Sequence, residues 1–216
     1  MTNEFVVHGA PGTGSVIVEA ALTLLGLPYR LADPGIDGDY QASLDAAMTV
    51  NPLRQLPAVR LPTGEVMTES GAILIWLTET FPGLAPPPAS PGRAAFLRWM
   101  MFVNTQIYAH YWGHDDPSRL ATSKAAQDRV QTALANRITH CWGVMGQALS
   151  EGCYTIGDEL TALDLCVAVV SRWTPGRKRF REAAPRLGEV ARRVDQDPRL
   201  ADFWPRRFPF PKGWEG

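Results

Sequence analysis

Five of the chain's 18 prolines fall within a single stretch, from Pro82 to Pro91. Proline lacks a backbone N–H and fixes φ, so this stretch excludes both a helix and a central strand. Such a run is typical of an extended, semi-rigid linker. We therefore expect a first domain at 1–82, a linker at 83–92 and a second domain at 93–216.

The segment before the linker alternates strand and helix signals, and the segment after it carries only helical spacing. Gly26 is placed to end the first helix, and Gly64 lies in a predicted hairpin turn. The order β-α-β-α-β-β-α predicts an α/β layer followed by an all-α domain. The expected strands are 5–8, 29–31, 56–61 and 65–67, and the expected helices are 15–25, 44–49, 69–80, 93–112, 118–149, 161–173 and 177–194.

Charge is balanced over the whole chain but not along it. There are 21 basic and 22 acidic residues, a net charge of −1, which excludes a strongly basic polyanion binder. Residues 1–82 carry a net −6 and residues 172–216 a net +6. This asymmetry is compatible with dimer contacts between unlike domains.

Location and redox state are suggested by what the sequence lacks. The first residues show no basic region followed by an apolar run, and no stretch has about 18 consecutive apolar residues, so we expect neither a secretory signal nor a membrane helix. The three cysteines, Cys141, Cys153 and Cys166, are odd in number and not closely spaced, so they do not suit a disulfide framework. We predict a cytoplasmic protein.

The first candidate site is the turn Gly9-Ala-Pro-Gly-Thr-Gly-Ser15 before the first helix. A helix N-terminus offers free N–H groups and partial positive charge to an anion, such as a phosphate or a thiolate. The spacing is neither GxGxxG nor a P-loop, which argues against a nucleotide. The hydroxyls of Thr13 and Ser15 are placed to bind a thiolate, and the alternative is that Ser15 only caps the helix.

Two further motifs follow in the first domain. Pro57, in the run Asn51-Pro-Leu-Arg-Gln-Leu-Pro-Ala-Val59, begins a strand-like segment. A cis bond there would present the Leu56 backbone to a peptide-like ligand, although a trans bond is commoner. Glu69 and Ser70 open a helix, where they can bind an ammonium and a carboxylate or serve as an ordinary cap.

In this order and at these separations, the three motifs resemble those of the glutathione transferase superfamily. Gly26-Leu-Pro-Tyr29 and Gly157-Asp-Glu-Leu-Thr-Ala-Leu-Asp164 resemble two further family segments, the second with Thr161 and Asp164 as a capping box. The resemblance covers the chain to about residue 200. It implies a thioredoxin-like first domain and a helical second one. The sequence resembles bacterial members whose active-site turn is of the serine/threonine type and not of the tyrosine or cysteine type.

The resemblance also implies roles for individual residues. Pro57 would be a cis-proline, the Leu56 backbone would pair with the cysteinyl part of glutathione, and Arg54 and Gln55 would reach the glycyl carboxylate or nearby backbone. Glu69 and Ser70 would hold the γ-glutamyl group. The sequence departs from the family pattern at the activating residue, because the bacterial cysteine position falls on Gly14.

Ser15 is therefore our first candidate for stabilising the thiolate and Thr13 our second, with backbone N–H groups as the alternative. Tyr108, Tyr111 and Trp112 are candidates for the electrophile site, although each could equally be a core residue. His110 and His114 stand four residues apart but lack the Glu of HExxH, so we expect no metal. The basic residues between Arg172 and Arg193 are interpreted as a solvated helix face in preference to a nucleic-acid site.

These observations lead to one expected function. The chain is expected to be a homodimeric detoxification enzyme that conjugates the glutathione thiolate, its co-substrate, to a hydrophobic electrophile. The alternatives are a glutathione-dependent isomerase, dehalogenase or lyase, and a non-catalytic binding protein of the same fold. No nucleic-acid or membrane partner is expected.

Overall fold

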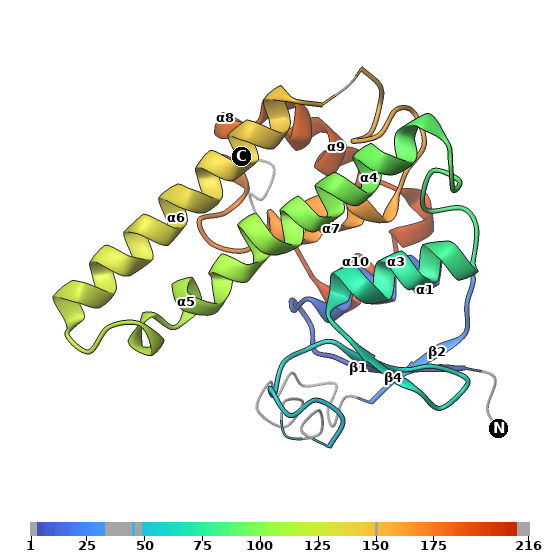
Figure 1. Cartoon of the computed structure of the whole chain (residues 1–216), viewed down its shortest axis with the longest axis horizontal. Coiled ribbons are helices and arrows are strands. Elements are labelled where there is room, and N and C mark those ends of the chain that lie inside the picture. Colours follow the sequence, from blue (N-terminus) through green and yellow to red (C-terminus); the bar gives the residue numbers. More distant parts are fainter. Residues whose placement is uncertain (1–3, 33–44, 46–48, 150, 211–216) are drawn as a thin grey trace. The chain divides into compact units, whose positions relative to one another are not determined.

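A computed structural model describes the chain at residues 4–32, 45, 49–149 and 151–210 (Figure 1). The chain divides into two compact units. The first consists of residues 1–85 together with 195–215, and the second of residues 86–194. The expected fold class is confirmed: a thioredoxin-like sheet with helices is followed by a helical region.

The first unit is built on a four-stranded sheet whose strands follow the order β2-β1-β3-β4. The strands are β1 (Phe5–His8), β2 (Tyr29–Leu31), β3 (Ala58–Arg60) and β4 (Val66–Thr68). β1 pairs with β2 in parallel, whereas β3 is antiparallel to both β1 and β4. The helix expected at 44–49 lies largely outside the described residues.

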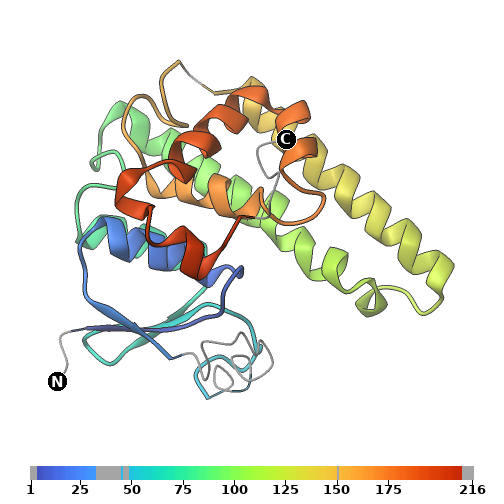
Figure 2. The ribbon, with the colours of Figure 1, turned by 180° about the vertical axis from the view of Figure 1, so that it is seen from behind.

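Helices α1 (Ser15–Leu24) and α3 (Ser70–Thr80) pack together on one face of this sheet (Figures 1 and 2). α1 is apolar almost all round, and its residues from Ser15 to Leu22 are buried. A helix that is hydrophobic on every side belongs in a core. Glu19 is the exception, because its carboxylate is buried among these apolar residues. Such a charge requires a partner.

The C-terminal residues belong to the first unit, whereas the sequence placed all of 93–216 in the helical domain. They form a 3₁₀ turn, η4 (Pro198–Leu200), which contacts α1, and a short helix, α10 (Trp204–Arg207). Leu200 and Trp204 are both buried. The difference arises because these apolar side chains pack with the first unit, a tertiary preference that local helical spacing does not encode.

The regular elements among the described residues of the second unit are all helical, apart from an isolated β-bridge between Tyr154 and Gly157. Two of the expected long helices are interrupted. The segment expected as 93–112 contains a π-helical turn, and the one expected as 177–194 breaks where Pro185 begins a new helix, in keeping with proline's preference for the first helical turn. The elements are α4 (Pro91–Phe102), η1 (Val103–Ile107), η2 (Tyr108–His110), α5 (Tyr111–Asp115), η3 (Pro117–Arg119), α6 (Lys124–Gln147), α7 (Ala162–Val170), α8 (Arg177–Ala183) and α9 (Pro185–Asp195).

Helix α7 forms the centre of the second unit, and all nine of its residues are buried. The capping box expected at its start is confirmed, because both reciprocal hydrogen bonds between Thr161 and Asp164 are present. Asp164 Oδ1 also accepts from the N–H (2.8 Å) and hydroxyl (2.6 Å) of Thr155. Complete burial raises the pKa of Asp164, and these hydrogen bonds oppose that rise.

In the part of the chain that the structure describes, every helix is too short or too polar to span a lipid bilayer. The three cysteines are free thiols: Cys141 and Cys166 are buried, and Cys153 is exposed.

Candidate functional site

The strand register brings the three motifs of the first unit to one end of the sheet. His8, the last residue of β1, pairs with Ala58, the first residue of β3. Ala58 also pairs with Thr68, the last residue of β4. The turn after His8, the proline before Ala58 and the helix start after Thr68 are therefore neighbours, although they lie up to 60 residues apart in sequence.

Glycines at two positions allow the turn after β1 to form. A Cβ at residue 9 would lie 2.3 Å from Ser15 Oγ, so only glycine fits there. Gly12 has a φ of 73°, which side chains other than glycine's rarely tolerate. Its N–H donates to the carbonyl oxygen of Arg207 at 2.8 Å, so the C-terminal segment reaches the turn.

The two predicted hydroxyls have different environments. Ser15 is the first residue of α1 and fully buried, and its hydroxyl donates to Glu19 Oε1 at 2.7 Å. Thr13 is only partly buried, and its Oγ1 lies 2.8 Å from the Ala10 carbonyl oxygen and 3.0 Å from Ser15 Oγ. The interpretation of Ser15 as a simple N-cap is wrong, because Gly14 is the N-cap and no side-chain cap is present.

Glu19 and Arg207 were not predicted from the sequence, and they form an ion pair that contacts this turn through Ser15. Arg207 Nε lies 2.5 Å from Glu19 Oε2, and its second guanidinium contact reaches Oε1 at 3.1 Å. The Glu19 side chain is fully buried, and that of Arg207 is 12% exposed. The available signal was a carboxylate on an otherwise apolar helix, which requires a cation from elsewhere in the chain.

The second motif has the expected backbone. The peptide bond between Leu56 and Pro57 is cis. Asn51 organises the preceding loop, because its side chain donates to the Gln55 carbonyl at 2.9 Å and its own carbonyl accepts from the Arg54 N–H at 2.9 Å.

Arg54 and Gln55 are both exposed. The guanidinium of Arg54 pairs with Asp45 at 2.6 Å on the surface. An exposed ion pair of this kind contributes little to stability. Arg54 could therefore exchange Asp45 for another carboxylate at little cost in free energy.

The third motif is held in an unusual backbone conformation. Glu69 has a φ of 65°, uncommon for a residue with a side chain, and its carboxylate is exposed. Ser70 follows as the first, buried residue of α3. Backbone strain of this kind tends to occur at ligand sites, which is consistent with a binding role here.

The three aromatic candidates lie in the second unit in three different environments. Tyr111 is 4% exposed and donates its hydroxyl to the Val170 carbonyl at 3.2 Å, so it is part of the core. Tyr108 is partly buried, with its ring 4.9 Å from that of Trp173. Trp112 is 47% exposed, and the Arg119 guanidinium lies over its ring.

The histidine pair does not form a metal cluster. His114 is buried, and its Nδ1 lies 3.1 Å from Asp115 Oδ1. Burial lowers the pKa of His110. Across the part of the chain that the structure describes, no group of three or more His, Cys, Asp or Glu side chains is arranged to hold a metal.

The basic segment is not simply a solvated face. Arg172 and Arg177 are buried, and Arg177 donates to the Ala168 carbonyl at 2.7 Å. That interpretation is therefore wrong for these two arginines, which belong to the interior of the second unit.

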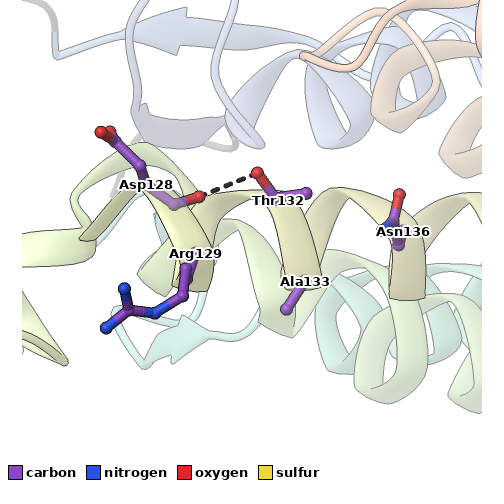
Figure 3. A pocket seen from close by; sticks show the side chains of 5 residues that line it. All are labelled: Asp128, Arg129, Thr132, Ala133 and Asn136. Atoms are coloured by element: carbon purple, nitrogen blue, oxygen red, sulfur yellow. Dashed lines mark hydrogen bonds between the residues drawn. The ribbon is translucent and has the colours of Figure 1, made fainter. Parts of the chain in front are cut away.

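A surface depression of about 360 Å³ lies along α6 (Figure 3). Its lining comes from one helix, where the Thr132 hydroxyl donates to the Asp128 carbonyl at 2.8 Å. It contains none of the predicted site residues, so it does not contribute to the candidate site. The lining residues are Asp128, Arg129, Thr132, Ala133 and Asn136.

Comparison with known proteins gives the family. The family model for the N-terminal domain of glutathione S-transferase matches residues 15–80. The uncharacterized GST-like protein YncG of Escherichia coli (strain K12) is 31% identical over 200 residues, which cover 93% of this chain and 97% of the relative. The chain belongs to the glutathione S-transferase superfamily.

Two further proteins are similar to this chain over much of its length. Maleylacetoacetate isomerase of Rattus norvegicus is 30% identical over 156 residues, 70% of this chain and 68% of that protein. A solved glutathione transferase homolog from Sulfitobacter, with bound glutathione, has a TM-score of 0.80 at 21% identity, covering 93% and 97% of the two chains. The two proteins therefore share their fold over nearly the whole of this chain.

Proposed function

We propose that this superfamily member binds glutathione at the end of the sheet where the three motifs meet, and transfers its thiolate to a hydrophobic electrophile. The observation that carries the proposal is the register of Ala58 with both His8 and Thr68, which gathers a turn, a cis-proline and a helix start. The glutathione-bound Sulfitobacter homolog supports the same ligand.

Each part of the tripeptide has a partner in this proposal. The Leu56 backbone pairs with the cysteinyl residue in the manner of an added strand. Ser70 and the N-terminus of α3 receive the γ-glutamyl carboxylate, and Glu69 receives its ammonium. Arg54, which already binds a carboxylate on the surface, reaches the glycyl carboxylate with Gln55 beside it.

Activation of the thiol requires stabilisation of its anion. A free thiol has a pKa of about 8.5, and lowering it by 2 units takes about 2.7 kcal/mol. One hydrogen bond to a charged group contributes about 1.5–3 kcal/mol, to which the N-terminus of α1 adds about 0.3–1 kcal/mol. Thr13 is the better candidate, because its hydroxyl is only partly buried, whereas Ser15 is fully buried and donates to Glu19. The Thr13 hydroxyl donates to the Ala10 carbonyl at 2.8 Å, so it would turn from that carbonyl to the sulfur when glutathione binds.

The electrophile site is proposed at Tyr108 and Trp112. Tyr111 is less suited to it, because its ring and hydroxyl are used in the core. Homodimer formation and a cytoplasmic location remain predictions.

Isothermal titration with glutathione tests the binding step, with S-methylglutathione as a probe of the thiol. Glutathione binding with turnover of a chlorinated nitroaromatic electrophile supports the transferase. No binding of glutathione would contradict the proposal and every glutathione-dependent alternative.

An isomerase is the second candidate, favoured by the similarity to maleylacetoacetate isomerase. Glutathione would then be regenerated, because it adds to and leaves the same double bond. Catalytic isomerisation of maleylacetoacetate at constant glutathione concentration, without conjugate formation, would select this activity over transfer. Binding with neither reaction would favour the non-catalytic alternative.

A further inference from the structure

The C-terminal segment makes two separate contacts with the region of the turn. Its backbone accepts a hydrogen bond, from the Gly12 N–H to the Arg207 carbonyl at 2.8 Å. Its side chain forms the ion pair with Glu19, through contacts of 2.5 and 3.1 Å. One residue, Arg207, therefore holds both the turn and the helix that follows it, and all of these atoms belong to the first unit.

Glu19 connects Arg207 to the predicted site residues through hydrogen bonds. Its Oε1 accepts from the Ser15 hydroxyl at 2.7 Å, and Ser15 Oγ in turn lies 3.2 Å from the Ala10 N–H and 3.0 Å from Thr13 Oγ1. A continuous set of polar contacts thus runs from Arg207 to Thr13. A displacement of Arg207 would therefore also displace the atoms that are proposed to face the sulfur.

The ion pair also has an electrostatic role. A buried carboxylate four residues into α1 would oppose a second anion bound at the start of the same helix, because like charges disfavour ionisation. The guanidinium of Arg207 neutralises that carboxylate. Without Arg207, the negative charge of Glu19 would be less compensated and would act more strongly against a thiolate at the turn.

Other titratable and charged groups lie near the pair. Tyr29 shares a hydrogen bond of 3.2 Å with Thr23, and the charges of Glu19, Arg207 and, least of the three, Arg206 act on its pKa. Burial raises the pKa of Tyr29, so its hydroxyl stays protonated at neutral pH. His8 ends the strand that leads into the turn.

We propose that Arg207 is a positioning residue for thiolate formation: it neutralises Glu19 and fixes the turn at residues 9–15 in its thiolate-binding geometry. This inference rests on the proposed function, because it assumes that the bound anion is the glutathione sulfur. It assigns a catalytic consequence to a residue of the C-terminal segment that acts through Glu19 and the turn.

The experiment compares four variants in the full-length protein. Arg207→Gln removes the positive charge, Arg207→Lys restores it, and Glu19→Gln/Arg207→Gln removes both charges. Arg206→Gln is the matched control, because Arg206 is the exposed neighbour and donates to the Asp202 carbonyl at 2.8 Å. The readout is the pKa of the bound glutathione thiol, from the ultraviolet absorbance of the thiolate against pH.

Arg207→Gln is expected to raise the pKa of the bound thiol by about 1 unit. At pH values below that pKa, kcat/KM should fall about tenfold, because less of the thiol is ionised. Arg207→Lys should recover most of the shift, and the double variant should return the pKa to within about 0.3 units of wild type, because the opposing anion is gone. Arg206→Gln should match wild type. An unchanged pKa in folded Arg207→Gln would overturn the proposal, as would an equal rise in the double variant.

A ligand-free readout separates this inference from the proposed function. Hydrogen exchange at the Gly12 amide should be at least about tenfold faster in Arg207→Gln than in wild type or Arg206→Gln. If wild type fails to bind glutathione, the proposed function fails, and this exchange result alone decides whether Arg207 fixes the turn. Unchanged exchange at Gly12 would overturn the positioning role. Where Arg207→Gln does not fold, the lysine and double variants carry the same comparison.

Discussion

Ala58 at the start of β3 lies opposite His8 at the end of β1 in the antiparallel register. Because strand pairing fixes which residues are neighbours, this one pair places the residue before Ala58 beside the turn that follows His8. Pro57 and Gly9 are those two residues. The candidate glutathione site follows from this arrangement, and its parts can be tested separately.

The first prediction concerns Ser70 at the N-terminus of α3. Ser70→Ala removes a donor to the γ-glutamyl carboxylate and should weaken glutathione binding about tenfold, the effect of losing about 1.4 kcal/mol of binding free energy. Titration calorimetry measures the change. Thr80→Ala, at the exposed opposite end of the same helix, is the control and should bind as wild type does. Equal affinity in Ser70→Ala would place the γ-glutamyl group elsewhere.

The second prediction separates the two hydroxyls of the turn. Thr13→Ala should raise the pKa of the bound thiol by about 1–2 units, because one hydrogen bond to a charged group is lost. Thr13→Ser keeps a hydroxyl and should retain most of the activity. The thiolate absorbance titration measures both variants.

Ser15→Ala should behave differently, because Ser15 donates to buried Glu19. We expect a loss of about 1–3 kcal/mol in the free energy of unfolding and a smaller rise in the thiol pKa than Thr13→Ala causes. A larger pKa rise in Ser15→Ala would reverse the assignment. If neither variant changes the pKa, backbone N–H groups are the activators.

A third prediction concerns the start of α7. Asp164→Ala removes the capping box and leaves donors of Thr155 and Thr161 without their acceptor, so it should lower the free energy of unfolding by about 2–4 kcal/mol. Urea unfolding measures this loss. Glu159→Ala, an exposed acidic neighbour, should stay within about 0.5 kcal/mol of wild type. A similar loss in both variants would contradict the specific role of the cap.

The fourth prediction is a pH dependence at the start of η4. Hydrogen bonds from Arg199 hold the pKa of Asp197 below its usual value in the folded protein. The stabilisation is therefore complete above the unfolded-state pKa of about 3.9 and is lost as the pH falls through the lower folded value. Asp197→Asn should be less stable than wild type near about pH 7, and this difference should shrink near about pH 2. A difference independent of pH would contradict the ionic origin.

Local patterns in the sequence were sufficient for the four strands and for helices α1 and α3 of the first unit, but not for η4 and α10. The strands at Phe5–His8 and Tyr29–Leu31 coincide with the expected ranges, because short apolar runs bounded by glycine or proline have few other structures available. The capping box at Thr161 is likewise a local pattern. The gathering of three motifs was predicted from their family resemblance, since strand register is not encoded locally.

Long-range partners were not predictable in the same way. The pair of Glu19 and Arg207 joins residues 188 positions apart, and nothing near either residue specifies the other. For the same reason, residues 195–215 were assigned to the helical domain. The burial of Arg177 was not predicted, because a run of basic residues is typical of a solvated helix face. Only the structure shows that the Arg177 guanidinium donates to the buried Ala168 carbonyl.

The most direct test of the glutathione site is a crystal structure of the chain with glutathione bound. We expect the sulfur within about 3.5 Å of Thr13 Oγ1, the cysteinyl backbone paired with Leu56, and the γ-glutamyl group at Glu69 and Ser70. Glutathione bound away from the end of the sheet where His8, Ala58 and Thr68 align would contradict the account.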